Sequence, residues 1–393
     1  MNTTISPLFG GSLLTYLSCP KGCSYGLCNV TCAMKFAATL ATFASALAAQ
    51  EGSTDATSAF EAWKVLHSKT YASAAEESRR FTIFRGHAER VFAAAETSTF
   101  SQGLVWEMLD RTPEELAALR GYSWSADKDV QPTPSGNAPR IAAMGSIPSS
   151  LDWRDENAVS DVKQQGQGSS CWSFSSAGAI EGAVAVKHKT PAVSLSNQQI
   201  MDCSGVDCLD AINGTMTKAF HNIIDWGGGV DTFASYGYRD MNCVSWDALC
   251  NPSMLDPRCA YWSPPHKCQH NHTSVANVTS YAHTLVGNET DLLLALLGGP
   301  IAVAMDASQG SFSSYTSGVY SDPRCQSDKD GLDHAVLLVG YGFDGTTRTP
   351  YWLVKNSWGP GWGIDGFFKI LRSETESGNM CGLATDASYP QVA

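Results

Sequence analysis

Three residues in the carboxyl-terminal part of the chain could together carry out nucleophilic catalysis. Cys171 stands in QQGQGSSCWSF, His334 in GLDHAVLLVGYG and Asn356 in YWLVKNSWGPGWG. A thiol is a useful nucleophile at neutral or acidic pH only where its thiolate is stabilised, for instance by a helix amino terminus and a nearby imidazolium. Cys171 opens a run of small residues with helical character, where unpaired N–H groups and the helix dipole favour an anion. We therefore expect a thiolate nucleophile at Cys171, assisted by a histidine and a third polar group.

These stretches resemble a papain-like cysteine protease of the cathepsin L type, over about residues 147–389. The resemblance implies that Cys171 is the nucleophile, that His334 is the general base and acid, and that Asn356 orients the imidazole. It also implies that Gln165 donates to the oxyanion, together with the backbone N–H of Cys171. The expected reaction is acyl transfer through a thioester.

Two further features bear on this resemblance. The separation between Cys171 and His334 exceeds the usual spacing of roughly 130 to 150 residues, and a Cys- and Pro-rich insertion at about 239–267 absorbs much of the difference. Trp358 matches the family tryptophan that shields the hydrogen bond between the Asn and His side chains from water. The sequence LDWR at 151–154 matches the start of the mature enzyme.

The resemblance also assigns substrate-binding residues. Gly214 lies on the cleft wall that contacts the substrate backbone, and Asp386 lies at the base of the pocket for the second residue before the scissile bond (P2). The apolar walls of this pocket are Met216, Ala304, Leu332 and Ala335. Such a pocket accepts Phe or Leu by burial, whereas Arg needs a carboxylate at the far end. We expect hydrophobic and also basic P2 residues; the alternative is that Asp386 points into solvent on a chain-end loop.

Length, composition and charge favour an exported globular protein. The 393 residues are 43% hydrophobic and 16% charged, and the net charge of -12 argues against binding to nucleic acid. Residues 34–49 predict a secretory signal peptide that is too short to span a membrane. Residues 1–33 are then an upstream extension of uncertain status, either a misplaced start or a genuine pre-signal segment. We expect a secretory route to a lysosome-like compartment or to the cell exterior.

The region between the signal and the catalytic stretches divides into helices and a linker. Apolar residues at helical spacing predict two helices between residues 57 and 95, and prolines and glycines mark a linker at 122–150. FEAWKVLHSKTY, with Glu76, Arg80 and Phe84, resembles the inhibitory prodomain helix of the family, although His87 replaces a usual Asn. The alternative is an ordinary pair of amphipathic helices. Acidification is expected to release this segment by protonating its carboxylates.

The expected fold class is therefore α+β. Residues 50–145 are expected to form a helical inhibitory propeptide with a linker. Residues 146–393 are expected to form a papain-like domain with one helical lobe and one antiparallel β-barrel-like lobe.

The cysteine count predicts one free thiol. Of 13 cysteines, nine follow the signal peptide, an odd number in an oxidising compartment. The resemblance pairs Cys325 with Cys381 and Cys203 with Cys268. It also implies that one family disulfide is absent, because Gly168 and Ala211 stand at the positions of its two cysteines. The expected cost of this absence is roughly 2 to 5 kcal/mol of stability. Four cysteines remain, and they could form two disulfides in any of three pairings or could bind zinc: Cys208, Cys243, Cys250 and Cys259.

The sequence thus predicts a zymogen of a cysteine endopeptidase that needs no cofactor or metal. Its expected partners are protein and peptide substrates and its own propeptide, and it is expected to be a monomer. Sequons at Asn271, Asn277 and Asn288 are consistent with glycosylation. Two alternatives stay open: an exopeptidase of the cathepsin B type that uses the insertion to block its cleft, and a non-catalytic binding homologue.

Overall fold

The computed structural model describes residues 55–94, 99–124, 147–204, 214–239, 274–373 and 378–393. The expected upstream extension, the signal peptide and nearly all of the insertion lie outside these residues. So do Ala211, Asn271, Cys208, Cys243, Cys250, Cys259 and Cys268. Across the described part of the chain, no helix combines the length and the apolar character needed to cross a membrane.

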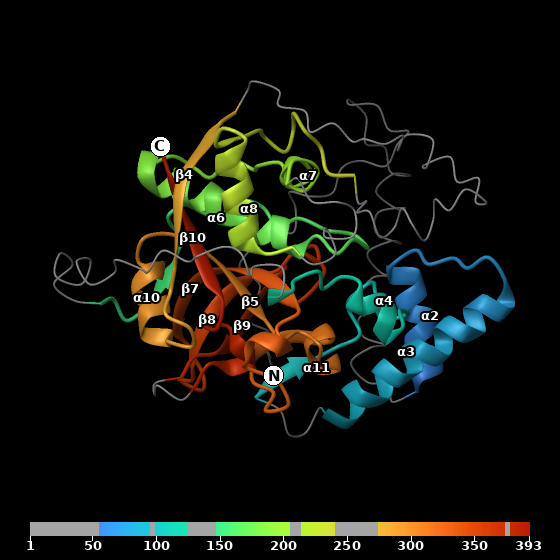
Figure 1. Cartoon of the computed structure of the whole chain (residues 1–393). Coiled ribbons are helices and arrows are strands. Elements are labelled where there is room, and N and C mark those ends of the chain that lie inside the picture. Colours follow the sequence, from blue (N-terminus) through green and yellow to red (C-terminus); the bar gives the residue numbers. More distant parts are fainter. Residues whose placement is uncertain (1–54, 95–98, 125–146, 205–213, 240–273, 374–377) are drawn as a thin grey trace, which may run out of the picture.

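Residues 55–94 and 99–124 form an amino-terminal arm, whose helices α2 and α3 lie at one side of the molecule (Figure 1). The arm contains α2 (Ala56–Leu66), α3 (Ala74–Ala94), β1 (Phe100–Gln102) and α4 (Pro113–Ala117). The two helices predicted between residues 57 and 95 are confirmed. The Asp55 side chain caps the start of α2, and Thr112 and Glu115 form a capping box at the start of α4.

The arm has its own aromatic core. The Phe84 ring of α3 packs against Phe60 and Trp63 of α2, with centroids 5.2 and 5.1 Å apart. The Trp63 indole N–H donates to the carbonyl of Trp106 at 2.9 Å. This contact ties the helix pair to the extended part of the arm.

The helical lobe is built around α6, which packs closely against the sheet. Its helices are α6 (Cys171–His188), α7 (Asn197–Asp202) and α8 (Met216–Asp225). A Cβ atom at Gly178 would lie 2.7 Å from Leu337, and one at Gly182 would lie 2.5 Å from Pro300. The small residues of this helix are therefore explained by its close approach to the strands, and its predicted start at Cys171 is confirmed.

The carboxyl-terminal half is mainly β, as predicted. Its strands are β2 (Leu151–Asp152), β3 (Gly229–Val230), β4 (Ala276–His283), β5 (Ile301–Met305), β6 (Tyr315–Tyr320), β7 (His334–Phe343), β8 (Pro350–Lys355), β9 (Phe367–Leu371) and β10 (Ala387–Val392). The order is β1-β6-β9-β8-β7-β5-β10-β4-β3, with β2 paired to β7. All pairs are antiparallel except β6 with β9, and the path of strands is open. The α+β class is confirmed.

Short helices connect these strands. They are α10 (Glu289–Leu296), α11 (Gly310–Ser313) and two 3-10 helices, η4 (Lys329–Gly331) and η5 (Met380–Gly382). The arm joins the sheet directly, because β1 pairs with β6 and Phe100 lies opposite Gly318.

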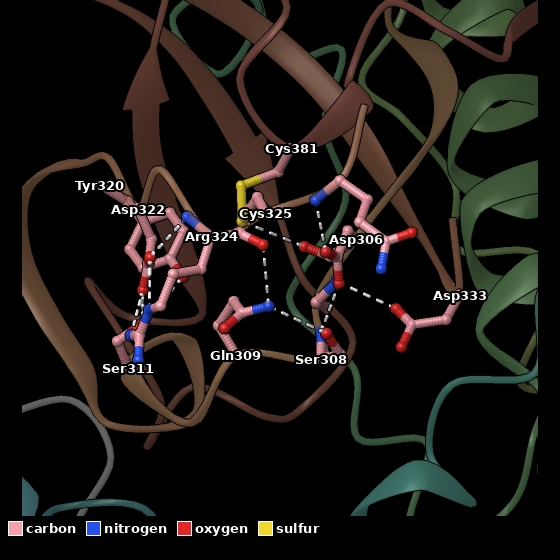
Figure 2. The surroundings of a disulfide bond; sticks show 12 residues. Asp306, Ser308, Gln309, Ser311, Tyr320, Asp322, Arg324, Cys325, Asp333 and Cys381 are labelled. Carbon is pink, nitrogen blue, oxygen red and sulfur yellow. Dashed lines mark hydrogen bonds and ion pairs between the residues drawn. A yellow bond between two sulfur atoms is a disulfide. The ribbon is translucent and has the colours of Figure 1, made fainter. Parts of the chain in front are cut away.

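The predicted disulfide between Cys325 and Cys381 is present, with the two Cα atoms 4.7 Å apart (Figure 2). The backbone N–H of Asp306 donates to the carbonyl of Cys381 at 2.8 Å, and the Asp306 carboxylate accepts from the Gln326 N–H at 2.7 Å. The bridge therefore braces the turn that follows β5. Cys203 is also disulfide-bonded, but its predicted partner Cys268 lies outside the described residues.

Candidate active site

The three residues singled out for nucleophilic chemistry converge where the helical lobe meets the sheet. Cys171 is the first residue of α6, His334 is the first residue of β7, and Asn356 follows directly after β8, which pairs with β7. The N–H of Ala335 points at the Cys171 sulfur, with 3.5 Å between N and Sγ. Two adjacent strands thus bring the imidazole and the amide to the helix terminus that carries the thiol.

The tautomer of His334 follows from its hydrogen bonds. Its Nε2 lies 2.9 Å from Asn356 Oδ1, and the same oxygen accepts the Ser357 N–H at 2.8 Å, which fixes the orientation of the amide. A neutral imidazole therefore carries its proton on Nε2. His334 Nδ1 is buried and makes no hydrogen bond within the described residues, so it is the nitrogen left to accept a proton.

Trp358 shields this pair, as its sequence context predicted. Its ring lies 4.9 Å from the His334 ring and packs against Trp362, with centroids 5.3 Å apart. His334 and Asn356 are both buried. The arm adds a second layer, because Trp106 stacks on Trp358 with ring centroids 4.6 Å apart.

Gln165 is held so that its amide N–H groups point into the site. Its Oε1 accepts the Ser357 hydroxyl at 2.6 Å, and its Nε2 donates to the carbonyls of Gly168 at 2.7 Å and Leu119 at 2.8 Å. Leu119 belongs to the arm. The Leu119 carbonyl oxygen thus accepts a hydrogen bond from Gln165 Nε2, the group expected to bind the oxyanion.

The arm also covers the thiol itself. The N–H of Gly121 donates to Cys171 Sγ at 3.3 Å, and the Gly121 carbonyl accepts the N–H of Gly214 at 3.1 Å. A Cβ atom on Gly121 would lie only 1.9 Å from the Ser169 carbonyl oxygen, so only glycine fits this passage. The arm therefore covers the sulfur with a backbone N–H group.

Burial by the arm changes the protonation of the pair. Loss of hydration raises the pKa of the Cys171 thiol to about 11 and lowers the pKa of the His334 imidazole to about 4. Desolvation is the largest influence on the Cys171 thiol and opposes the N–H groups that point at the sulfur, so the expected thiolate stays a prediction for the uncovered site. Both shifts favour the neutral forms of the thiol and the imidazole while the arm covers them.

The apolar residues expected to form the P2 pocket belong to one buried cluster that also includes a residue of the arm. Tyr122 shares one buried apolar cluster with Met216, Ala304, Leu332 and Ala335. The backbone of Tyr122 pairs with Gly214 and donates its N–H to the Asp333 carbonyl at 3.2 Å. A Cβ atom on Gly214 would lie 2.2 Å from the Trp172 ring, so glycine is required on this wall.

Asp386, expected at the base of this pocket, is 2% exposed. The alternative of a solvent-facing side chain is therefore wrong. The Tyr122 hydroxyl donates to Asp386 Oδ2 at 2.5 Å. Burial raises the pKa of the Asp386 carboxyl to about 6, against the opposing effect of that hydrogen bond.

An ion pair links the arm to the residue before His334. Arg120 Nε lies 2.5 Å from Asp333 Oδ2, while Asp333 Oδ1 accepts the Ala307 N–H at 2.9 Å. Figure 2 shows Asp333 reaching toward the turn that the disulfide braces. The disulfide, the β5 turn and the start of β7 are thereby connected.

The loop that lacks the usual bridge is held without a covalent bond. The Tyr238 hydroxyl donates to the Gln165 carbonyl at 2.8 Å and lies 2.7 Å from the Ser170 hydroxyl. One phenol therefore fastens both ends of the loop around Gly168. Within the described residues, no cluster of three or more His, Cys, Asp and Glu side chains could hold a metal ion.

Sequence reasoning missed the arm residues that occupy the cleft. Leu119, Gly121 and Tyr122 fall in a short stretch with no periodicity at the edge of the predicted linker. Two of them act through backbone atoms that every residue has, so their identity gave little signal. The insertion on which the exopeptidase alternative rests lies outside the described residues.

Comparisons with known proteins agree with this geometry. The family model described as papain family cysteine protease matches residues 147–391. Procathepsin L of Mus musculus is 36% identical over 336 residues, which cover 84% of this chain and 90% of the mouse protein. Cathepsin L of Sarcophaga peregrina is 36% identical over 345 residues, covering 84% of this chain and 91% of the fly protein.

A solved structure is similar over the arm as well. Digestive procathepsin L 3 of the Tenebrio molitor larval midgut matches with a TM-score of 0.67 at 32% identity, covering 85% of this chain and 98% of that one. This coverage exceeds residues 147–391 and so extends into the region that precedes them.

Proposed function

The chain belongs to the papain family of cysteine proteases and is a cathepsin L-type cysteine peptidase made as a proform, and we propose that its catalytic residues are Cys171, His334, Asn356 and Gln165. The observation that carries this proposal is the fixed hydrogen bond from His334 Nε2 to Asn356 Oδ1 beside the helix terminus that bears the thiol. We also propose residues 50–145 as the propeptide and 146–393 as the protease domain.

The proposed reaction is peptide hydrolysis in two steps. His334 Nδ1 takes the proton of the Cys171 thiol, and the sulfur attacks the scissile carbonyl carbon. The oxyanion is stabilised by Gln165 Nε2 and the Cys171 N–H. The C–N bond then breaks as His334 protonates the leaving amine, and water attacks the thioester to release the acid and restore the thiol.

In the proform, the arm blocks this reaction at each position. The Leu119 carbonyl is bound to the oxyanion donor, the Gly121 N–H lies against the sulfur, and Tyr122 fills the P2 pocket. The proposed route to activity is removal of the arm by cleavage in the linker before residue 147. We propose secretory export through a signal at 34–49, action in a lysosome-like compartment or outside the cell, and a monomeric endopeptidase that acts on protein and peptide substrates.

The test is active-site titration of the processed protein with an epoxide or vinyl sulfone thiol reagent. We expect one equivalent to label Cys171, with no labelling of the Cys171→Ala variant or of the denatured protein. Purified Cys171→Ala proform is expected to stay intact at acidic pH. Self-processing of that variant, or a processed wild-type protein that does not react, contradicts the proposal.

The proposed specificity is for hydrophobic and basic P2 residues. The buried carboxylate of Asp386 at the end of an apolar pocket supports it. We expect Asp386→Ala to lower kcat/KM for Arg peptides at least about tenfold relative to Phe or Leu peptides, or roughly 1.4 kcal/mol. A parallel loss on both peptide types in a kinetic comparison would remove Asp386 from the recognition of basic residues.

A further inference from the structure

The arm supplies an occupant of the P2 pocket whose chemistry can be examined directly. Tyr122 is 3% exposed and belongs to the same buried apolar cluster as Met216, Ala304, Leu332 and Ala335. Its hydroxyl reaches the pocket end and donates to Asp386 Oδ2 at 2.5 Å. The pocket therefore has the depth of a whole phenol, with an acceptor placed at the hydroxyl.

The far side of Asp386 is polar as well. His283 Nδ1 from β4 lies 3.8 Å from Asp386 Oδ1, and His283 Nε2 lies 3.3 Å from the Thr217 hydroxyl of α8. Asp386 Oδ1 is buried and makes no hydrogen bond within the described residues. One carboxylate oxygen thus faces the imidazole, and the other is directed toward the pocket occupant.

We propose that this pocket selects tyrosine at P2, with Asp386 accepting the hydrogen bond of the substrate phenol as it accepts that of Tyr122. The proposal rests on the proposed function, because it concerns the same cleft. Among the hydrophobic P2 side chains, it places first those that carry a phenolic hydroxyl.

The physical reason for the selection is the cost of an unpaired polar group. Phe would fill the apolar walls equally well but would leave the Asp386 oxygen buried without its donor. A site built to bind a hydroxyl discriminates strongly against the analogue that lacks it. Tyr brings the donor on a rigid ring and needs no buried cation, whereas Arg brings a charge that must be desolvated.

The test uses processed enzyme and fluorogenic peptides that differ only in having Tyr or Phe at P2. We expect kcat/KM for the Tyr peptide to exceed that for the Phe peptide at least about tenfold. The same exchange at P1 serves as the matched control, with a ratio near one. A P2 ratio near one in the wild-type enzyme overturns the proposal and needs no variant.

Two variants assign the selection to Asp386. The ratio is expected to fall to near one in Asp386→Ala and to an intermediate value in Asp386→Asn, whose amide oxygen can still accept the phenol O–H. A high ratio that persists in both variants overturns the assignment. Enzyme that cleaves neither peptide and does not react with the epoxide reagent refutes the proposed function, and the pocket proposal with it.

The proform provides an independent measurement. Tyr122→Phe removes the same hydrogen bond from the arm, so this proform is expected to process itself faster than wild type at the same pH. An unchanged rate contradicts the inference that Asp386 holds a phenol at this position.

Discussion

The arm and the lobes that it covers are held together by different interactions. Arg80 of α3 is 9% exposed, donates to Glu76 at 2.7 Å and to the Asp110 carbonyl at 2.9 Å, and binds Glu115 through both carboxylate oxygens. The sheet around the candidate active site also packs aromatic side chains such as Trp358, as the arm does, but it is in addition braced by a disulfide. The arm contains no cysteine, so we expect its stability to depend more on ion pairs and protonation than that of the disulfide-braced lobe.

His87 of α3, which replaces a usual asparagine, makes the stability of the arm sensitive to pH. Burial and the neighbouring Arg90 lower the pKa of the His87 imidazole from 6.5 to about 4. The unfolded arm therefore binds more protons between these values, and the stability of the folded arm falls as the pH drops from about 6.5 to 4. A hydrogen bond with the backbone of Arg111 and the charge of Asp110 both oppose this lowering of the His87 pKa.

The carboxylates of the arm titrate in a lower range. The Arg80 guanidinium holds the pKa of Glu115 below its usual value, and Arg79 and Arg80 lower the pKa of Glu76 to about 2. Their contribution is present above a pH of about 4.5 and is lost only below it. Glu76 and Glu115 are therefore not the carboxylates that titrate at mildly acidic pH. Asp386, which accepts the Tyr122 hydroxyl and whose pKa is raised to about 6 by burial, titrates in that range, so release of the arm by carboxylate protonation stays a prediction.

The largest effect is expected from Arg80→Ala. This change leaves two carboxylates and a carbonyl without their donor, so the arm should lose about 3 kcal/mol of stability. When Arg80→Ala is introduced into the inactive Cys171→Ala proform, we expect the melting temperature of the arm to be lower than in the Cys171→Ala proform alone. Arg79→Ala is the matched control, because Arg79 also pairs with Glu76 but is half exposed. Equal losses in the two variants would contradict the comparison.

A smaller effect is expected from His87→Gln, which removes the titrating group. The pH at which half of the proform is processed in a fixed time should fall by about half a unit. Processing is measured by gel electrophoresis across a pH series. His221→Gln, at an exposed histidine of α8, should leave this midpoint unchanged. An unaltered midpoint in His87→Gln would assign the acid response to another group.

The smallest effect is expected from salt. Raising NaCl from about 0.05 M to about 0.5 M screens partly exposed ion pairs and should destabilise the arm by less than about 1 kcal/mol. The melting temperature of the processed domain should move less than that of the arm in the Cys171→Ala proform. A larger shift in the processed domain would reverse the comparison.

The sequence predicted the chemistry of the site better than its covering. Cys171, His334 and Asn356 could be placed together because each has a distinctive flank, and the start of α6 followed from its small residues. The sequence left two alternatives for the Asp386 side chain, a buried pocket or solvent, because a single carboxylate near a chain end has no local signal for burial. Its position depends on β10 pairing between β5 and β4, which is a property of the whole sheet.

The covering of the cleft could not be predicted for a different reason. Leu119 and Gly121 contact Gln165 and Cys171 through a backbone carbonyl and a backbone N–H. Such contacts are set by the path of the chain and not by side-chain type. The path itself is fixed by distant contacts, such as Trp106 on Trp358 and Arg120 with Asp333, which sequence spacing does not reveal.

The pairing of β1 with β6 has a consequence for the protein after the arm is gone. β6 has β9 as its other neighbour, so loss of the arm leaves a row of backbone N–H and C=O groups without their former partners. Unpaired strand edges invite other chains to add to them. The processed enzyme is therefore expected to be less soluble at high concentration than the proform, and the arm acts as a guard against self-association during storage and transit.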